Sequence, residues 1–143
     1  MKIILAGDHG AFELKKEIIK HLQDKTSYQI INLGVDNGES VDYPSYAQKL
    51  CSAILAKEAE RGVLLCGTGL GMSIAANRFK GIRGALCHDE YTARMSRQHN
   101  DANVLILGAR TIGVATALGI VDVWLQEDFV GGRHQRRLDK IEK

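Results

Sequence analysis

The sequence contains no segment that could serve as a membrane span or as a secretion signal. No apolar run approaches the roughly eighteen residues that a membrane helix needs, and Met1-Lys2 leads directly into a strand-like apolar segment. The net charge is only +2, which is too small to indicate a surface for nucleic acid. These absences predict a cytoplasmic protein that binds neither membranes nor nucleic acids.

Cysteine is scarce as well. Cys51, Cys66 and Cys87 are odd in number and show no CxxC spacing. This pattern predicts reduced thiols, with no disulfide framework and no zinc site. The 143 residues are 45% hydrophobic and 25% charged and show no internal repeat or linker. We therefore expect one globular domain over residues 1–143.

Short apolar segments alternate with amphipathic segments along the chain. Strands are predicted at 2–6, 28–33, 62–65, 82–87 and 104–107. Helices are predicted from 44 to about 59, with Pro44 at the first helical position, at 90–98 and at about 111–125. Three more helices are predicted to begin after Gly10, at about residue 72 and after Gly132. This order predicts a single-domain, three-layer α/β/α Rossmann-like fold, with a five-stranded parallel sheet and a C-terminal helix.

The most informative stretch is RGVLLCGTGLGMS, at residues 61–73. A buried strand delivers Cys66 to a turn in which Gly67, Gly69 and Gly71 let the backbone approach a ligand closely. Backbone N–H groups at the start of the following helix would face an anion, with help from the helix dipole. The pattern places a thiol beside an anion-binding turn.

Other interpretations of this turn make different demands on the sequence. A P-loop needs a lysine after its glycines, and a cysteine-phosphatase loop needs an arginine where Met72 stands. A dinucleotide fingerprint fits better, because Asp89 follows Gly69 by twenty residues as a ribose ligand would, but the glycines read GxGxG and not GxGxxG. Dinucleotide binding and a purely structural turn remain alternatives to a catalytic loop.

In such a sheet, ligands bind at the carboxyl ends of the strands. That edge collects Asp8, His9, Tyr43, Cys66 and Arg110. Each has a structural alternative: the aspartate could cap the next helix, the histidine could be solvated in its loop, the tyrosine could be a packing residue and the arginine a surface cation. Their convergence on one edge with a thiol favours a catalytic site.

Two candidate groups fall outside this edge. His99 lies between the fourth helix and the fifth strand, so it belongs to the amino-terminal edge, away from Cys66 of its own chain. Arg133 and Arg137 share one face of the final helix, and guanidinium groups match phosphate oxygens. Alternatively, the histidine stabilises a helix end, and the arginines form a solvated basic end or a weak nucleic-acid patch. The functional hypothesis requires a two-fold dimer with shared sites.

Several motifs, in order along nearly the whole chain, resemble type B ribose-5-phosphate isomerase: GDHG, DYP, CGTGLGMSIAANRFKGIR, SRQHNDANVLILGAR and GGRHQRR. The resemblance implies an aldose–ketose isomerase of the pentose phosphate pathway that interconverts ribose 5-phosphate and ribulose 5-phosphate. It also implies a dimer or tetramer that uses neither metal nor nucleotide nor another cofactor. Allose-6-phosphate isomerases belong to the same family and galactose-6-phosphate isomerase subunits are close to it, so the sugar stays open.

The resemblance also assigns roles to residues. Cys66 becomes the proton-abstracting base, although some relatives use a glutamate from the same region, and His99 becomes the group that opens the furanose ring. The implied substrate-binding residues are Asp8, His9, Gly67, Gly69, Leu70, Gly71, Asn100, Arg110, Arg133 and Arg137, and we add Tyr43 because of its expected place at the same edge of the sheet. Arg78 stands where many members have lysine.

The chemistry of such a reaction fits these residue types. Moving a carbonyl between C1 and C2 requires removal of a carbon-bound proton and stabilisation of an enediolate. A helix N-terminus favours a thiolate and the developing oxyanion alike, Thr68 could pass a proton between the two substrate oxygens, and an imidazole such as that of His99 can shuttle protons near neutral pH. Because Cys66 and His99 occur in one chain, a silent subunit that needs a different partner chain is disfavoured.

Overall fold

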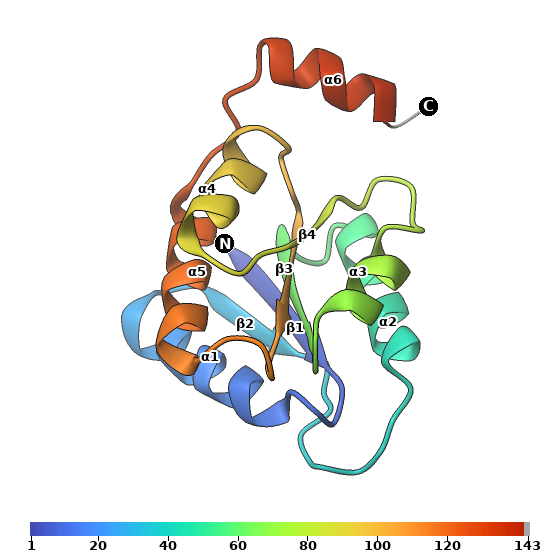
Figure 1. The fold of residues 1–143 in the computed structure, drawn as a ribbon, viewed down its shortest axis with the longest axis vertical. Helices are drawn as coiled ribbons and strands as arrows, with labels where there is room; N and C mark the ends of the chain where they lie inside the picture. Colours follow the sequence, from blue (N-terminus) through green and yellow to red (C-terminus); the bar gives the residue numbers. More distant parts are fainter. Residues whose placement is uncertain (142–143) are drawn as a thin grey trace.

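Strands and helices alternate along residues 1–141, the part of the chain that the computed structural model describes (Figure 1). The strands are β1 (Lys2–Gly7), β2 (Gln29–Asn32), β3 (Arg61–Cys66), β4 (Gly84–Leu86) and β5 (Val104–Gly108). The helices are α1 (Phe12–Lys25), α2 (Tyr43–Leu55), α3 (Leu70–Ala76), α4 (Glu90–Gln98), α5 (Val114–Gln126) and α6 (Arg133–Ile141).

The strands form one parallel sheet in the order β2-β1-β3-β5-β4. β3 lies at its centre, and all six of its residues are buried, as expected for a strand covered on both faces. In register, Leu5 lies beside Val63, and Val63 beside Leu105. The predicted five-stranded parallel sheet is confirmed.

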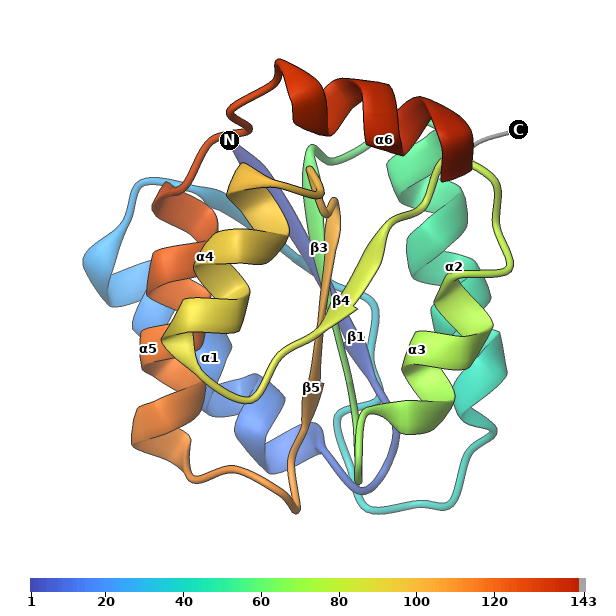
Figure 2. The ribbon, with the colours of Figure 1, turned by 45° about the horizontal axis from the view of Figure 1, so that its top comes forward.

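Helices cover both faces of the sheet, α1, α4 and α5 on one and α2 and α3 on the other (Figure 2). This division follows from right-handed crossovers, because the connections through α1 and α4 move toward one edge of the sheet and those through α2 and α3 toward the other. Ile18 and Trp124 anchor one apolar layer, and Leu50 and Met72 anchor the other. The predicted three-layer fold is therefore confirmed.

The structure corrects both predicted ends of the helix that contains Pro44. Pro44 occupies the second helical position of α2 and not the first, because Asp42 is the N-cap residue and Tyr43 already belongs to the helix. The same helix ends at Leu55 and does not continue to residue 59, since Lys57 takes a left-handed conformation with φ of 61°.

The C-terminal helix α6 stands apart from the layers, above the amino ends of the strands (Figure 1). Gly131 and Gly132 precede it with φ of 74° and 59°, so the chain turns sharply there through left-handed backbone. His134 and Leu138 are its buried residues. Over residues 1–141, no helix combines the length and the apolar character that crossing a membrane requires.

Candidate active site

Cys66 ends β3 at the carboxyl edge of the sheet, and its side chain is turned into the glycine-rich turn. The residue is 5% exposed. The backbone N–H of Gly69 donates to its Sγ at 3.2 Å. Gly69 has φ of 80° and is the N-cap residue of α3, so the turn needs glycine there to direct its amide at the sulfur. An amide donor at this distance stabilises negative charge on sulfur.

Tyr43 lies directly against the same turn. A Cβ atom added at Gly71 would lie 2.6 Å from Cζ of Tyr43, so only glycine leaves room for the ring. Thr68 shapes the turn from within, because its Oγ1 accepts a hydrogen bond from the Leu70 N–H at 3.2 Å. The turn that holds the thiol therefore also carries a hydroxyl and packs against an aromatic ring.

Arg110 follows β5 and links two loops of the same edge. Its guanidinium lies against the backbones of Gly10 and Gly67, where an added Cβ atom would meet Nη2 and Nη1 respectively, each at 3.3 Å. The Arg110 backbone N–H donates to the Gly67 carbonyl at 2.9 Å, which extends the pairing of β5 with β3 beyond the strands. A positive charge is thus fixed beside the cysteine turn.

Asp8 and His9 come from the loop after β1. Asp8 is 8% exposed, and its Oδ1 accepts from the Gly10 N–H at 2.9 Å. It does not cap α1, because Ala11 is the N-cap residue and no side chain caps that helix. His9 Nδ1 accepts a hydrogen bond from the Val41 N–H at 3.1 Å. A neutral His9 in this position carries its proton on Nε2.

The loop that supplies Val41 is tied down by a buried lysine that the sequence analysis did not single out. The Lys15 side chain is 1% exposed, and its Nζ donates to Asn32 Oδ1 at 2.6 Å and to Asp36 Oδ1 at 2.7 Å. Asp36 also accepts a hydrogen bond from the Asn32 side chain. The hydrogen bond from Lys15 lowers the pKa of Asp36 most, and that from Asn32 lowers it further. In the sequence, the only indication that Lys15 is buried is its position next to Leu14 in the apolar stripe of α1.

A second group of candidate residues lies at the opposite edge of the sheet. His99 and Asn100 follow α4, and Arg133 and Arg137 are exposed on α6. The His99 ring stacks on the His134 ring with centroids 4.1 Å apart and an interplanar angle of 11°. Burial, followed by the influence of His99 and the two arginines, lowers the pKa of His134. His134 was not predicted as a site residue, although it stands beside Arg133 in the GGRHQRR motif.

The two groups do not meet within one chain. Cys66 lies at the carboxyl end of β3, whereas the segment after His99 meets the other end, where the Gly62 N–H donates to the Asn103 carbonyl at 3.0 Å. The strand spans five steps from Arg61 to Cys66, which at about 3.3 Å per step separates its ends by roughly 16 Å. As predicted, the structure places His99 away from Cys66 of its own chain.

Three surface hollows have linings that do not include Cys66. One of about 550 Å³ lies over α1, beside Lys16 and Lys20, and another of about 550 Å³ lies near Lys57. A hollow of about 340 Å³ includes Gly10 and Ala109, on the flank of the Arg110 loop. Within residues 1–141, no three or more His, Cys, Asp or Glu side chains are grouped so as to hold a metal ion.

The sequence of the chain matches a known protein family over nearly its whole length. Residues 3–141 match the model of the family described as Ribose/Galactose Isomerase. The chain belongs to this family. Ribose-5-phosphate isomerase B of Escherichia coli is 46% identical over 140 residues, which cover 98% of this chain and 93% of that protein.

Solved structures agree with this membership. A ribose-5-phosphate isomerase B from Clostridium thermocellum is 51% identical with a TM-score of 0.97, covering 99% of this chain and 95% of that one. A ribose 5-phosphate isomerase from Thermotoga maritima is 52% identical with a TM-score of 0.96, covering 99% and 97%. The resemblance to type B ribose-5-phosphate isomerase is confirmed, and with it the assignment as an aldose–ketose isomerase.

The dinucleotide alternative loses its proposed ribose ligand. Asp89 is the N-cap residue of α4, and its Oδ1 accepts from the Thr92 N–H at 2.7 Å and from the Thr92 hydroxyl at 2.9 Å. These hydrogen bonds lower the pKa of Asp89, that from the Thr92 backbone most strongly. The carboxylate is thus already committed to starting a helix.

Proposed function

We propose that the protein interconverts ribose 5-phosphate and ribulose 5-phosphate without a metal or other cofactor. It acts in the cytoplasm as a homodimer, or as a tetramer built from such dimers. Two kinds of observation support this proposal: the site itself, and relatives named ribose-5-phosphate isomerase B that align over almost the entire chain. The three cysteines, which are buried and unpaired, fit a reducing compartment.

The observation that carries the proposal is the Cys66 sulfur held against the Gly69 N–H at the carboxyl edge of the sheet. A thiolate at this point would remove the C2 proton of the open-chain aldose, and the electron pair of that bond would form the C1–C2 double bond of an enediolate. The backbone amides of the turn and the Arg110 guanidinium stabilise the negative charge as it develops on oxygen.

The enediolate then collapses to the ketose. Cys66 returns the proton to C1, and Thr68 moves a proton from the oxygen on C2 to the oxygen on C1. His9, with a proton on Nε2, and Asp8 hold the sugar hydroxyls, and Tyr43 closes one side of the pocket. The phosphate binds to arginines, because the guanidinium fork matches its oxygens.

The second group of residues completes the site from another copy of the chain. His99 opens the furanose ring by moving a proton between the ring oxygen and the hydroxyl on C1, and Asn100 contacts the sugar. Arg133 and Arg137 reach the phosphate region from the same copy. The separation of about 16 Å along β3 supports this division, because a hydrogen bond spans only about 3 Å.

Replacement of the base tests the proposal. Cys66→Ala should lower kcat by about 10²- to 10⁴-fold while KM changes little, because a general base acts mainly in the transition state. Cys51→Ala, which removes another buried thiol, on α2 and outside the turn, serves as the matched control and should keep kcat. If Cys66→Ala retained most of its turnover, the assignment of the base would be wrong.

The choice of sugar needs a separate measurement. Steady-state kinetics with ribose 5-phosphate, allose 6-phosphate and galactose 6-phosphate should give the highest kcat/KM for the five-carbon substrate. A higher value for either six-carbon phosphate would reassign the substrate within the family. Failure of the purified chain on all three would favour a subunit that requires a different partner chain.

A further inference from the structure

The turn after His99 contains a residue in a conformation that few side chains adopt. Asp101 has φ of 46°. The end of α4 closes around it, since the Asp101 N–H donates to the Arg97 carbonyl at 3.2 Å and the Ala102 N–H donates to the Ser96 carbonyl at 2.9 Å. Glycine or asparagine usually takes the left-handed position at a helix end. An aspartate at this position suggests that its carboxylate is needed there.

The Asp101 carboxylate lies between two arginines. Arg97 Nη1 donates to its Oδ1 at 3.0 Å, and Arg83 Nη2 donates to its Oδ2 at 3.2 Å. The Arg97 side chain is 7% exposed and that of Arg83 is 24% exposed. The Asp101 side chain is 35% exposed, so these ion pairs are partly sheltered and are screened less than fully exposed pairs, and two arginines hold the carboxylate from different sides.

The same two arginines also hold the backbone of the turn. Arg83 Nε donates to the carbonyls of Asn100 and Asp101 at 3.1 and 3.0 Å, and Arg97 Nη1 donates to the Ala102 carbonyl at 2.6 Å. Three successive carbonyls therefore accept charged donors. The peptide groups that follow His99 are fixed from both sides.

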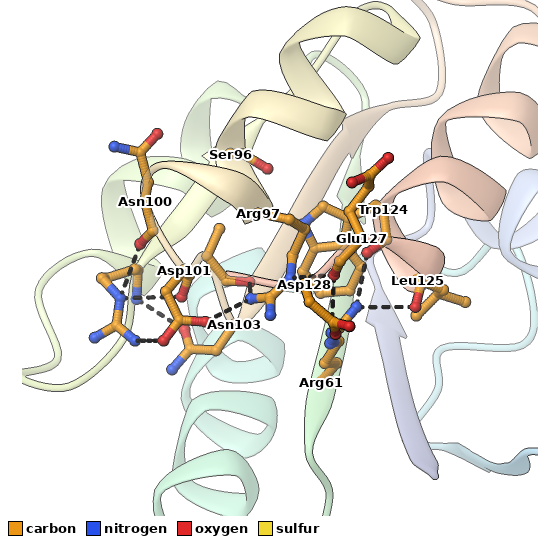
Figure 3. A network of polar contacts seen from close by, with 12 residues as sticks. Arg61, Ser96, Arg97, Asn100, Asp101, Asn103, Trp124, Leu125, Glu127 and Asp128 are labelled. Atoms are coloured by element: carbon orange, nitrogen blue, oxygen red, sulfur yellow. Dashed lines mark hydrogen bonds and ion pairs between the residues drawn. The ribbon is translucent and has the colours of Figure 1, made fainter. Parts of the chain in front are cut away.

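Arg97 connects this turn to the C-terminal end of α5 (Figure 3). Its Nε donates to the Glu127 carbonyl at 3.3 Å, and its guanidinium lies 5.9 Å from the centre of the Trp124 ring. Arg61 of β3 holds the same helix end, donating to the carbonyls of Trp124, Leu125 and Glu127 at 2.7, 3.0 and 3.1 Å. The turn is thus tied to the central strand and to a helix of the core.

We propose that Asp101, held by Arg97 and Arg83, is a positioning residue that sets the location of His99 and Asn100 for the active site of the neighbouring copy. The inference rests on the proposed function, in which His99 opens the sugar ring. A side chain that must reach across to another subunit depends on a rigid turn, because a displacement of about 1 Å can reduce turnover on the order of 10²-fold. The carboxylate supplies this rigidity, which a glycine in the same backbone conformation would lack.

Two substitutions separate the carboxylate from the backbone conformation. Asp101→Gly keeps the left-handed turn and removes the carboxylate, and Asp101→Asn tolerates the turn and removes the charge. Both should lower kcat by about tenfold or more when assayed well below the melting temperature, which should itself fall because Arg97 and Arg83 lose their shared carboxylate. Lys57→Gly is the matched control, since Lys57 also has positive φ but lies at the end of α2, and it should keep the wild-type kcat. Wild-type kcat in Asp101→Gly would overturn the inference.

A second measurement asks whether the loss acts through ring opening. Ribulose 5-phosphate is acyclic, whereas ribose 5-phosphate is mostly a closed ring. With Asp101→Gly, as with His99→Ala, the forward rate should stop rising with enzyme concentration once uncatalysed ring opening becomes limiting, and the reverse rate should keep rising. A general structural defect would lower both rates in proportion to the active enzyme.

A double-mutant cycle completes the test. In a His99→Ala background, Asp101→Gly should cause less than a twofold further loss, because the group that it positions is already absent. Losses that multiply would overturn the positioning role while leaving the proposed function intact. Full activity of His99→Ala alone would refute the ring-opening role of His99 and with it the positioning role of Asp101, whereas the isomerase function is tested separately by Cys66→Ala. If Asp101→Gly does not fold, Arg97→Lys, which keeps the charge but cannot hold Asp101 and Ala102 together, takes its place in the cycle.

Discussion

Mixing two defective variants, Cys66→Ala, which lacks the base, and His99→Ala, which lacks the ring-opening group, should restore enzyme-catalysed turnover of ribose 5-phosphate. Within one chain, the two residues lie toward opposite ends of β3, which are roughly 16 Å apart, so each proposed site combines Cys66 of one copy with His99 of another. In a mixed dimer, one site then carries both substitutions and the other carries neither. Each variant supplies the half of the site that its partner lacks.

The expected recovery follows from the pairing. Unfolding an equal mixture and refolding it lets chains pair at random, so half of the dimers contain one chain of each kind. Each mixed dimer has one intact site of two, which gives about one quarter of the wild-type activity per site. The assay is the rate of ribulose 5-phosphate formation after refolding, normalised to a refolded wild-type sample.

Pairs of variants within one group provide the control. Cys66→Ala mixed with His9→Ala should recover nothing, because both substitutions fall in the same half of the site. Cys66→Ala mixed with Arg137→Ala should recover like the original pair. No recovery by Cys66→Ala with His99→Ala, while refolded wild-type protein regains its activity, would refute the division of the site between two chains.

Three further predictions concern the packing and charges around the site. Gly71→Ala should lower kcat/KM with little change in thermal stability, because the new Cβ would lie 2.6 Å from Cζ of Tyr43; unchanged kinetics would show that the ring position does not matter. Arg61→Leu should lower the free energy of unfolding by about 3 kcal/mol, because three carbonyls lose a charged donor; urea denaturation measures this, and a change within experimental error would contradict it. A hydrogen bond from Lys15, above all, holds the pKa of Asp36 below its ordinary value of 3.8. The ionised carboxylate therefore stabilises the fold above that pH, and this stability is lost as the pH falls through the folded-state pKa. Asp36→Asn should lose less stability than the wild type between neutral and acid pH, and an equal loss in the two proteins, measured by urea denaturation at each pH, would refute this.

The sequence was sufficient to predict the layers, because apolar runs and amphipathic stripes are local patterns. The helix at 90–98 was predicted with its observed bounds, since an aspartate cap begins it and the QHND turn ends it. The end of α2 was missed because a lysine, Lys57, and not a glycine, takes the left-handed conformation there. The order of the strands was not predicted, since it depends on contacts between distant segments.

The candidate site was also predicted only in part. Asp8, Cys66 and Arg110 were predicted to share an edge, because the carboxyl ends of parallel strands meet there. The supports of the site were not predicted: Lys15 and Arg61 look like ordinary surface residues in the sequence, yet both are buried. Their partners lie more than fifteen residues away, so no spacing indicates them.

The placement of two half-sites at opposite ends of one sheet makes catalysis, under the proposed arrangement, a property of paired molecules. A chain on its own would hold a thiol without its ring-opening imidazole. Dilution below the dissociation constant of the dimer would then lower the activity per molecule, even though every chain stayed folded. The cell could therefore adjust flux through this reaction by changing the amount of protein, with a response steeper than simple proportion.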